Sequence, residues 1–171
     1  MQRRTFLAIG GFGLGATSVY AGWTVFSSPT IPDGMEVETL YVEGDVSAEH
    51  FSRDHGHMDS EEEYATIIET EETADREMSG DESVTEFIAD TDFSASYLVV
   101  VQNAMQSMPD LELDSIHRRD EGLRIDVSID APWSGVDDDR ITHSLLIRIT
   151  DGESGVPDTV DVKIDGYDSI P

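Results

Sequence analysis

Cysteine is absent from all 171 residues of this chain. The protein therefore has no disulfide bond, no thiol nucleophile and no cysteine-ligated zinc or iron–sulfur cluster. Basic residues are scarce, because 10 Lys and Arg stand against 37 Asp and Glu, which gives a net charge of −27. Lys163 is the sole lysine and Asn103 the sole asparagine. So large a negative charge argues against nucleic acid and anionic lipid as partners.

The excess of acid predicts a protein that works in brine. Acidic side chains repel one another across a Debye length of ~10 Å at 0.1 M salt, but of only ~3 Å at 1 M salt. Compact carboxylates have largely replaced the lysine and asparagine side chains, as on the surface of a halophile's protein. The alternative is an acidic protein from ordinary surroundings.

The N-terminus resembles a twin-arginine export signal, and the residues that match this pattern are Arg3, Arg4, Phe6 and Leu7. A glycine-rich, mildly apolar segment follows, and a cleavage site is expected near Ala21. Alternatively, Phe6 to Phe26 forms an uncut helix of ~31 Å, long enough to cross a bilayer. Either way, we expect the domain on the extracytoplasmic side, released after cleavage or tethered by this segment. Contact with the membrane is expected only through it.

The chain divides into three parts on composition. Residues 1–28 are the signal or membrane anchor, residues 29–34 are a linker with two prolines and a glycine, and residues 35–171 are a single acidic β-rich domain. Residues 45–92 are expected to form an acidic, partly helical insertion in that domain.

Tyr97–Val101 is the most apolar stretch after the leader, and it predicts a strand buried on both faces. Other strands are expected at 35–42, 64–68, 111–118, 123–129, 141–149 and 160–164, and residues 103–109 are expected to be a connection. The predicted fold is mainly β: an antiparallel sheet or small β-sandwich of about seven strands. An α+β fold is the alternative.

Two short helices are expected inside the insertion. Thr70 is placed to cap the first, which should end near Met78. Ser83 and Glu86 have the spacing of a capping box for the second, whose apolar residues should cover an end of the sheet.

A histidine cluster raises the question of a metal site, in which His50, His55 and His57 would bind a divalent metal. The competing interpretation is a solvated loop. Asp137–Asp139 lacks the interleaved spacing of a calcium loop, so we expect a solvated turn there. Trp133 is a contact residue if it is exposed and a plug for the sheet edge if it is buried.

No catalytic constellation is evident in the sequence. Residues 152–156 begin like a nucleophile elbow, but Val156 stands where the motif needs glycine. His143 falls within a predicted strand, which favours a structural role. We therefore expect a protein that is not an enzyme and has no cofactor.

Two resemblances are carried by residues 97–102, 123–132 and 141–149. Behind the Arg-Arg-Thr-Phe-Leu leader, these strands resemble uncharacterised, twin-arginine-exported proteins of halophilic archaea. Residues 95–150 are also similar to the small β domain of protease-complex accessory subunits. The first resemblance implies an exported location, and the second implies a non-catalytic subunit.

The function expected from the sequence is therefore binding to another molecule. The chain should be a non-enzymatic, exported or membrane-tethered β domain that binds a protein or cell-envelope component. The alternatives are a metal-binding protein that uses the histidine cluster and a protease-associated accessory subunit.

Overall fold

The computed structural model describes residues 28–48, 63–106, 110–120, 122–130 and 140–165. The strands are β1 (Met35–Val42), β2 (Glu63–Ile68), β3 (Ser96–Gln106), β4 (Asp110–Arg119), β5 (Gly122–Asp130), β6 (Arg140–Asp151) and β7 (Val160–Asp165). The helices are α1 (Glu71–Glu77) and α2 (Glu82–Ala89). This confirms the predicted mainly β fold with two short helices.

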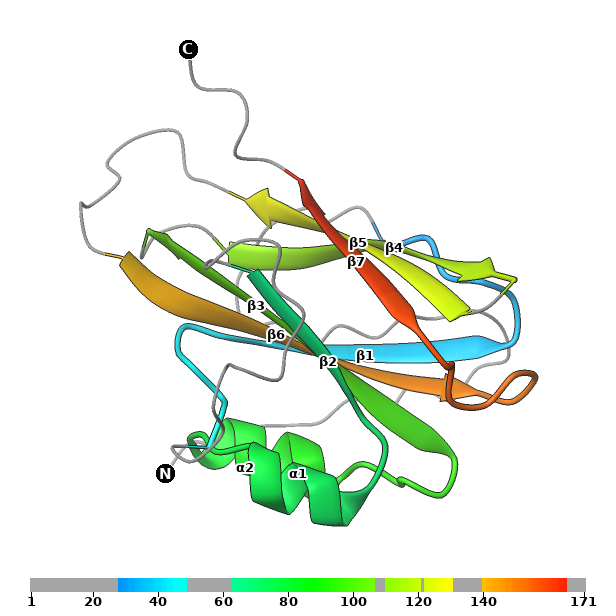
Figure 1. The fold of residues 1–171 in the computed structure, drawn as a ribbon, viewed down its shortest axis with the longest axis horizontal. Coiled ribbons are helices and arrows are strands. Elements are labelled where there is room, and N and C mark those ends of the chain that lie inside the picture. The colour runs from blue at the N-terminus through cyan, green and yellow to red at the C-terminus, as the bar shows by residue number, and fades with distance from the viewer. Residues whose placement is uncertain (1–27, 49–62, 107–109, 121, 131–139, 166–171) are drawn as a thin grey trace, which may run out of the picture.

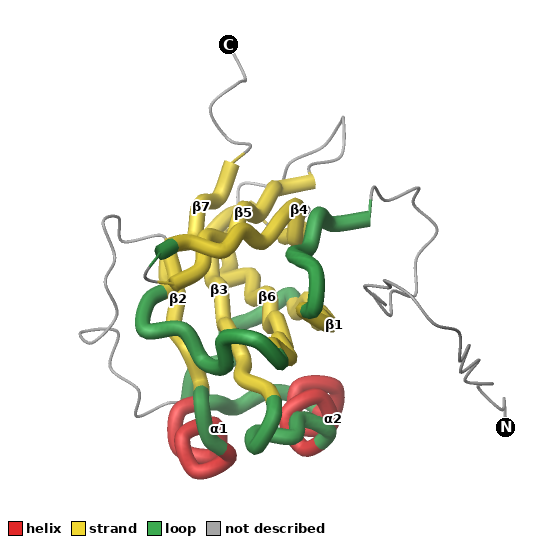
Figure 2. Tube along the Cα trace, turned by 90° about the vertical axis from the view of Figure 1, so that its right-hand side faces the viewer, coloured by secondary structure: helices red, strands yellow, loops and turns green. Residues whose placement is uncertain are grey.

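The elements form three layers (Figures 1 and 2). A four-stranded sheet in the order β1-β6-β3-β2 lies in the middle, and a three-stranded sheet in the order β4-β5-β7 packs on one of its faces. Helices α1 and α2 cover the opposite face. The helices thus cover a face of the sheet and not its end, because their apolar side chains pack on the sheet's outward-pointing residues.

The central strand β3 separates two hydrophobic clusters. Val99 and Val101 point into the core between the two sheets, whereas Leu98 and Val100 point towards the helices. All four are almost fully buried. This confirms the predicted strand that is buried on both faces, and it explains why the run is apolar without alternation.

Strand β3 continues to Gln106, so the prediction that residues 103–109 form a connection is wrong for 103–106. The polar pair Gln102 and Asn103 looked like a strand end, but both are buried. The amide nitrogen of Gln102 donates to Asp45 Oδ1 and Ser144 Oγ, each at 2.9 Å. A buried amide with these partners is tolerated within the sheet.

Helix α1 has the predicted cap, since the Thr70 side chain accepts a hydrogen bond from Thr73 N at 3.1 Å. The capping box predicted for α2 is wrong. Asp81 is its N-cap, and Asp81 Oδ1 accepts from Ser83 N at 2.9 Å and from Val84 N at 3.2 Å. Asp and Ser are equally good caps, so the sequence left a choice between two positions that lie two residues apart.

Arg148 of β6 holds α2 on the sheet. Its guanidinium lies 4.6 Å from the centre of the Phe87 ring and pairs with Glu38 of β1. Nη1 also donates to Thr91 Oγ1 at 3.3 Å. The one arginine therefore joins two strands and the end of α2 through a cation–π contact and charge-assisted hydrogen bonds.

Two other features differ from the sequence prediction. Strand β7 pairs with β5 in parallel, whereas antiparallel pairing throughout was expected. An alternating strand shows the same pattern in either direction, so the sequence did not distinguish the two. Within the predicted linker, Thr30 forms a parallel bridge with Ser115 of β4, and Ile31 packs against the core.

Gly122 allows β5 to lie close to the start of β7. A Cβ atom at this position would be 2.1 Å from Thr159 O, the same oxygen that accepts from Leu123 N. We expect Gly122→Ala to lower the free energy of unfolding by about 1–3 kcal/mol, as overpacking does. Denaturant unfolding in molar salt measures this.

Gly152→Ala is the matched control, because a Cβ there meets nothing within 4 Å. It should change stability by less than about 1 kcal/mol. Equal stability of the two variants would show that the approach of Thr159 to the hairpin is not a constraint on the fold.

Candidate functional site

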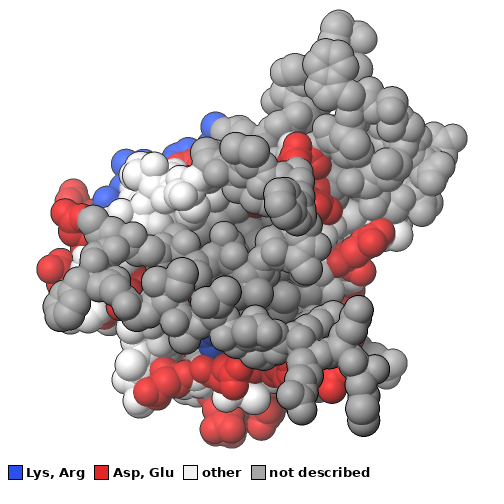
Figure 3. Space-filling model, turned by 180° about the vertical axis from the view of Figure 1, so that it is seen from behind, with Lys and Arg blue, Asp and Glu red and all other residues white. Residues whose placement is uncertain are grey.

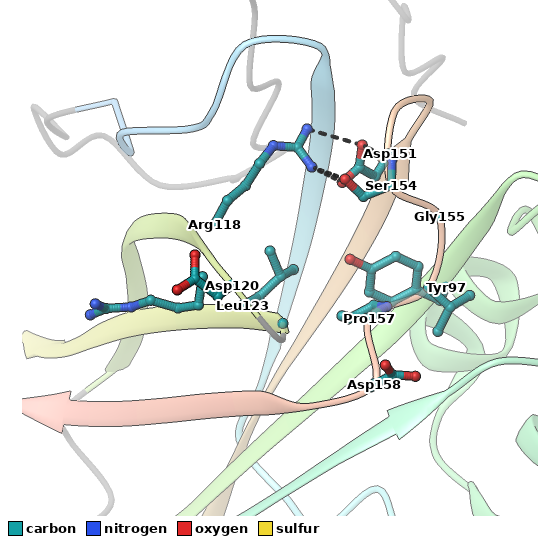
Figure 4. Close-up of a pocket in the computed structure, with 12 residues that line it drawn as sticks. Tyr97, Arg118, Asp120, Leu123, Asp151, Ser154, Gly155, Pro157 and Asp158 are labelled. Carbon is teal, nitrogen blue, oxygen red and sulfur yellow. Dashed lines mark hydrogen bonds and ion pairs between the residues drawn. The ribbon is translucent and has the colours of Figure 1, made fainter.

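A cavity of about 230 Å³ opens at one end of the sandwich (Figure 4). Three segments that are distant in sequence meet there: the beginning of β3 at Tyr97, the turn between β4 and β5, and the connection from β6 to β7. The residues whose side chains define its chemistry are Tyr97, Arg118, Asp120, Ser154 and Asp158. Its walls carry both charged and hydroxyl side chains.

An ion pair between Arg118 and Asp151 forms one wall. Both terminal nitrogens of the guanidinium reach the carboxylate, with Nη2 to Oδ1 at 3.0 Å and Nη1 to Oδ2. The Asp151 side chain is only 1% exposed, whereas that of Arg118 is 28% exposed. Nη1 also donates to Ser154 Oγ at 2.9 Å, so the pair holds the β6–β7 connection against β4.

The carboxylate of Asp151 also organises the turn that follows it. Oδ1 accepts from Glu153 N at 3.0 Å and from Ser154 N at 3.2 Å. Burial raises the pKa of Asp151, but the hydrogen bonds from Arg118 and the two amides outweigh burial, so the pKa lies below its usual value. Asp151 is therefore ionised at neutral pH, and both of its carboxylate oxygens accept hydrogen bonds.

Tyr97 lines the cavity from the core side. It is 1% exposed, and among the described residues its hydroxyl oxygen has no hydrogen-bond partner. Burial, and to a smaller degree the Asp151 charge, raises the pKa of Tyr97 far above its usual value. The hydroxyl is thus protonated at any physiological pH, and Figure 4 shows it pointing into the space between Ser154 and Leu123.

The surroundings of Ser154 differ from those of an activated serine nucleophile. Ser154 accepts a hydrogen bond from Arg118, and no histidine lines the described part of the cavity, so the serine lacks the histidine partner of a Ser–His pair. Ser154 also lies in a strand-to-strand connection, whereas a nucleophile elbow lies between a strand and a helix.

A triad-like group, Ser115, His117 and Asp126, lies on the outer face of the three-stranded sheet. Ser115 Oγ is 3.0 Å from His117 Nε2, and Asp126 Oδ2 is 3.8 Å from that same nitrogen. A catalytic triad needs the acid on the other ring nitrogen, so these three residues do not form one. A hydrogen bond from Arg124 is the main cause of the lowered pKa of Asp126.

No sequence signal indicated this group or the cavity. A register shift between Leu113 and Ser115 places Ser115 opposite Asp126, and the sequence does not reveal such a β-bulge. Of the cavity residues, Tyr97 was predicted only as part of a buried strand, and residues 152–156 were considered only for a motif that they do not form.

His143, considered for catalysis, is completely buried in β6. The Tyr41 hydroxyl lies 2.5 Å from its Nδ1, and the two rings stack with centroids 5.9 Å apart. This is the environment of a histidine that contributes to packing between β1 and β6. It does not face the cavity.

Several sequence predictions fall outside the described residues. These are the export-signal residues Arg3, Arg4, Phe6 and Leu7, the cleavage site near Ala21, the histidines His50, His55 and His57, the acidic run 137–139, and Trp133. Within the described ranges, no helix has the length and apolarity needed to cross a bilayer. In the same ranges, no three side chains of His, Asp or Glu gather as metal ligands would.

The histidine cluster remains a prediction with a direct test. If His50, His55 and His57 bind a divalent metal, protein purified in molar salt should contain about one equivalent, measured by elemental analysis. A triple His→Ala variant should lose it, because neutral imidazoles are the stronger ligands for zinc or copper among the side chains of that segment. Metal-free protein, or unchanged affinity in the variant, would contradict the idea.

No model of a known protein family matches the chain, and neither does any curated protein or solved structure. The geometry of the site is therefore the basis for assigning a function.

Proposed function

We propose that the chain is a non-enzymatic binding domain on the extracytoplasmic side of a salt-adapted cell, where it binds a protein or cell-envelope component. The observation that supports this best is the chemistry of the cavity. Arg118 and Asp151 neutralise each other in its wall, and its serine accepts a hydrogen bond from Arg118 and has no histidine beside it among the described lining residues. Such a wall can orient a bound group without a reactive side chain.

The distribution of charge supports the salt-adapted part of the proposal. Residues 69–92, which include both helices, carry ten acidic residues and one basic residue, Arg76. Figure 3 shows red side chains along the helical layer at the bottom and at several other places on this face, with most of the blue ones at the top, beside the three-stranded sheet. The density of acids on the helical layer is what a surface adapted to brine would carry.

The N-terminal pattern supports the location. Arg3 and Arg4 with Phe6 and Leu7 match an export signal, and export through that route would follow folding. A domain that folds in salty cytoplasm before export fits this order of events.

The test is affinity capture from membranes in molar salt, with mass spectrometry of what is retained and of the bait's own N-terminus. We expect one envelope component, lost when the bait is unfolded by removing salt and recovered when salt returns. Capture of a protease-complex subunit would favour the accessory-subunit alternative. The proposal would be overturned by two results together. The first is that no component is specifically retained, and the second is that a broad substrate screen finds an enzymatic activity that one point substitution abolishes.

A further inference from the structure

We propose that the cavity at Tyr97 binds one neutral, hexose-sized sugar unit of an envelope glycan. This inference rests on the proposed function and names the chemistry of the component bound. It starts from the buried Tyr97 hydroxyl, a polar group that lacks a partner among the described residues and lies just beneath the cavity surface, facing the space between Ser154 and Leu123. Such a group costs about 1–3 kcal/mol in folding stability unless a ligand satisfies it, so it needs an explanation.

The size of the cavity limits the ligand. At about 230 Å³ it is smaller than the ~300–1,000 Å³ clefts that hold drug-sized ligands. It has the room of about eight water molecules at ~30 Å³ each. A single sugar ring is of this order, whereas a folded protein segment or a lipid tail is much larger.

The polar groups of the cavity are mixed, as a sugar requires. The hydroxyls of Tyr97 and Ser154 can donate, since Ser154 already accepts from Arg118. The carboxylates of Asp120 and Asp158 can only accept, and they come from the hairpin and from the approach to β7. Sugar hydroxyls both donate and accept, so they match donors on one side and carboxylates on the other.

The charges favour a neutral ligand. Arg118 and Asp151 cancel each other, which leaves Arg119 against Asp120 and Asp158 in the lining. This balance is slightly negative in a protein of net charge −27, so a ligand anion would be repelled. A cation would find only isolated carboxylates, because the described residues contain no cluster fit for a metal.

Apolar side chains complete the site. Leu123 and Pro157 line the cavity, and Val156 is the one large hydrophobic side chain of the described residues that is strongly exposed, at 42%. One face of a sugar ring consists of C–H groups, and these three side chains offer an apolar surface for it.

The turn after Asp151 must move for the ligand to reach its deepest contact. The Tyr97 oxygen has less than 1 Å² exposed. Residues 152–156 are all exposed, and hydrogen bonds to Asp151 hold them in place. We therefore expect binding to shift this turn outward while the Arg118–Asp151 pair keeps its base fixed.

The test uses Tyr97→Phe, which removes only the hydroxyl. Full-length protein in molar salt is titrated with glucose, galactose, mannose and glucuronate, and binding is followed by NMR. We expect at least one neutral hexose to bind with a dissociation constant in the millimolar range. Tyr97→Phe should weaken it about fivefold, the effect of one hydrogen bond. The melting temperature of the ligand-free variant should be unchanged or higher, because an unpaired buried group is gone.

Tyr41→Phe is the matched control. It removes a hydroxyl that bonds His143 outside the cavity, so it should lower the melting temperature and leave sugar affinity unchanged. The inference is overturned if no hexose binds at 50 mM, if Tyr97→Phe binds equally well, or if glucuronate binds more tightly than every hexose. If an envelope protein is captured and any of these results is also obtained, the sugar site is disproved but the proposed function is still supported.

Discussion

Replacing Arg118 with alanine is expected to lower the free energy of unfolding by about 3 kcal/mol in molar salt. The substitution leaves the Asp151 carboxylate, 1% exposed, without its cation. Breaking a buried pair from one side costs ~3–5 kcal/mol, and the lower end applies here because Arg118 is itself 28% exposed. Chemical denaturation monitored by tryptophan fluorescence and by circular dichroism measures the change.

Arg119→Ala is the control for Arg118→Ala. Arg119 is the next residue of β4 and is exposed, so its loss should change stability by no more than about 0.5 kcal/mol. A double variant, Arg118→Met with Asp151→Leu, should recover part of the loss, since apolar replacement of both partners removes the unpaired charge but also removes the acceptor of the hydrogen bonds from Glu153 N and Ser154 N. If Arg118→Ala and Arg119→Ala are equally stable, the ion pair does not hold the end of the sandwich together.

The Arg118–Asp151 pair also predicts how the stability of the protein depends on pH. Asp151 has a lowered pKa in the folded protein, so its stabilising contribution is present above the unfolded value of ~3.9. This contribution is lost as the pH falls through the lower pKa that Asp151 has in the folded protein. The difference in stability between wild type and Arg118→Ala should therefore be full at pH 6 and shrink below about pH 4.

The strands were predictable because side-chain alternation is a local property. Leu123, Ile125 and Val127 of β5 alternate with polar residues, and all three point into the core between the two sheets, as expected. Tyr97–Val101 lacks alternation, and that lack itself predicted burial on both faces. Pattern reading works here because each strand shows its buried face within a few residues.

The cavity was not predictable, because it is made by contacts between distant segments. Arg118 and Asp151 are separated by 33 residues, and nothing in the sequence singles out Asp151 among 37 acidic residues. The parallel direction of β7 and the β-bulge in β4 also depend on tertiary pairing. Only the folded structure shows that the Tyr97 hydroxyl lacks a partner among the described residues and that Arg118 pairs with Asp151.

The second large effect concerns salt, because we expect most of the protein's stability to disappear in dilute buffer. Two carboxylates about 8 Å apart in water repel by ~0.5 kcal/mol before screening. Mobile ions reduce this to ~0.2 kcal/mol at 0.1 M salt and to below ~0.05 kcal/mol at 1 M. Over the dozens of neighbouring acidic pairs that 37 acids create, the difference reaches several kcal/mol, which rivals a typical total stability of ~5–15 kcal/mol.

The helical layer should respond first to the loss of salt, because its ten acids face a single arginine between residues 69 and 92. Hydrogen exchange at 0.1 M and 3 M salt should show α1 and α2 losing protection before the sheets do. Asp75→Asn with Glu86→Gln removes two exposed charges from this layer and should reduce the salt dependence. Sucrose in place of salt controls for general exclusion of cosolvent, since it does not screen charge. Equal stability at 0.1 M and 3 M salt would remove the physical basis for reading this acidic surface as an adaptation to brine.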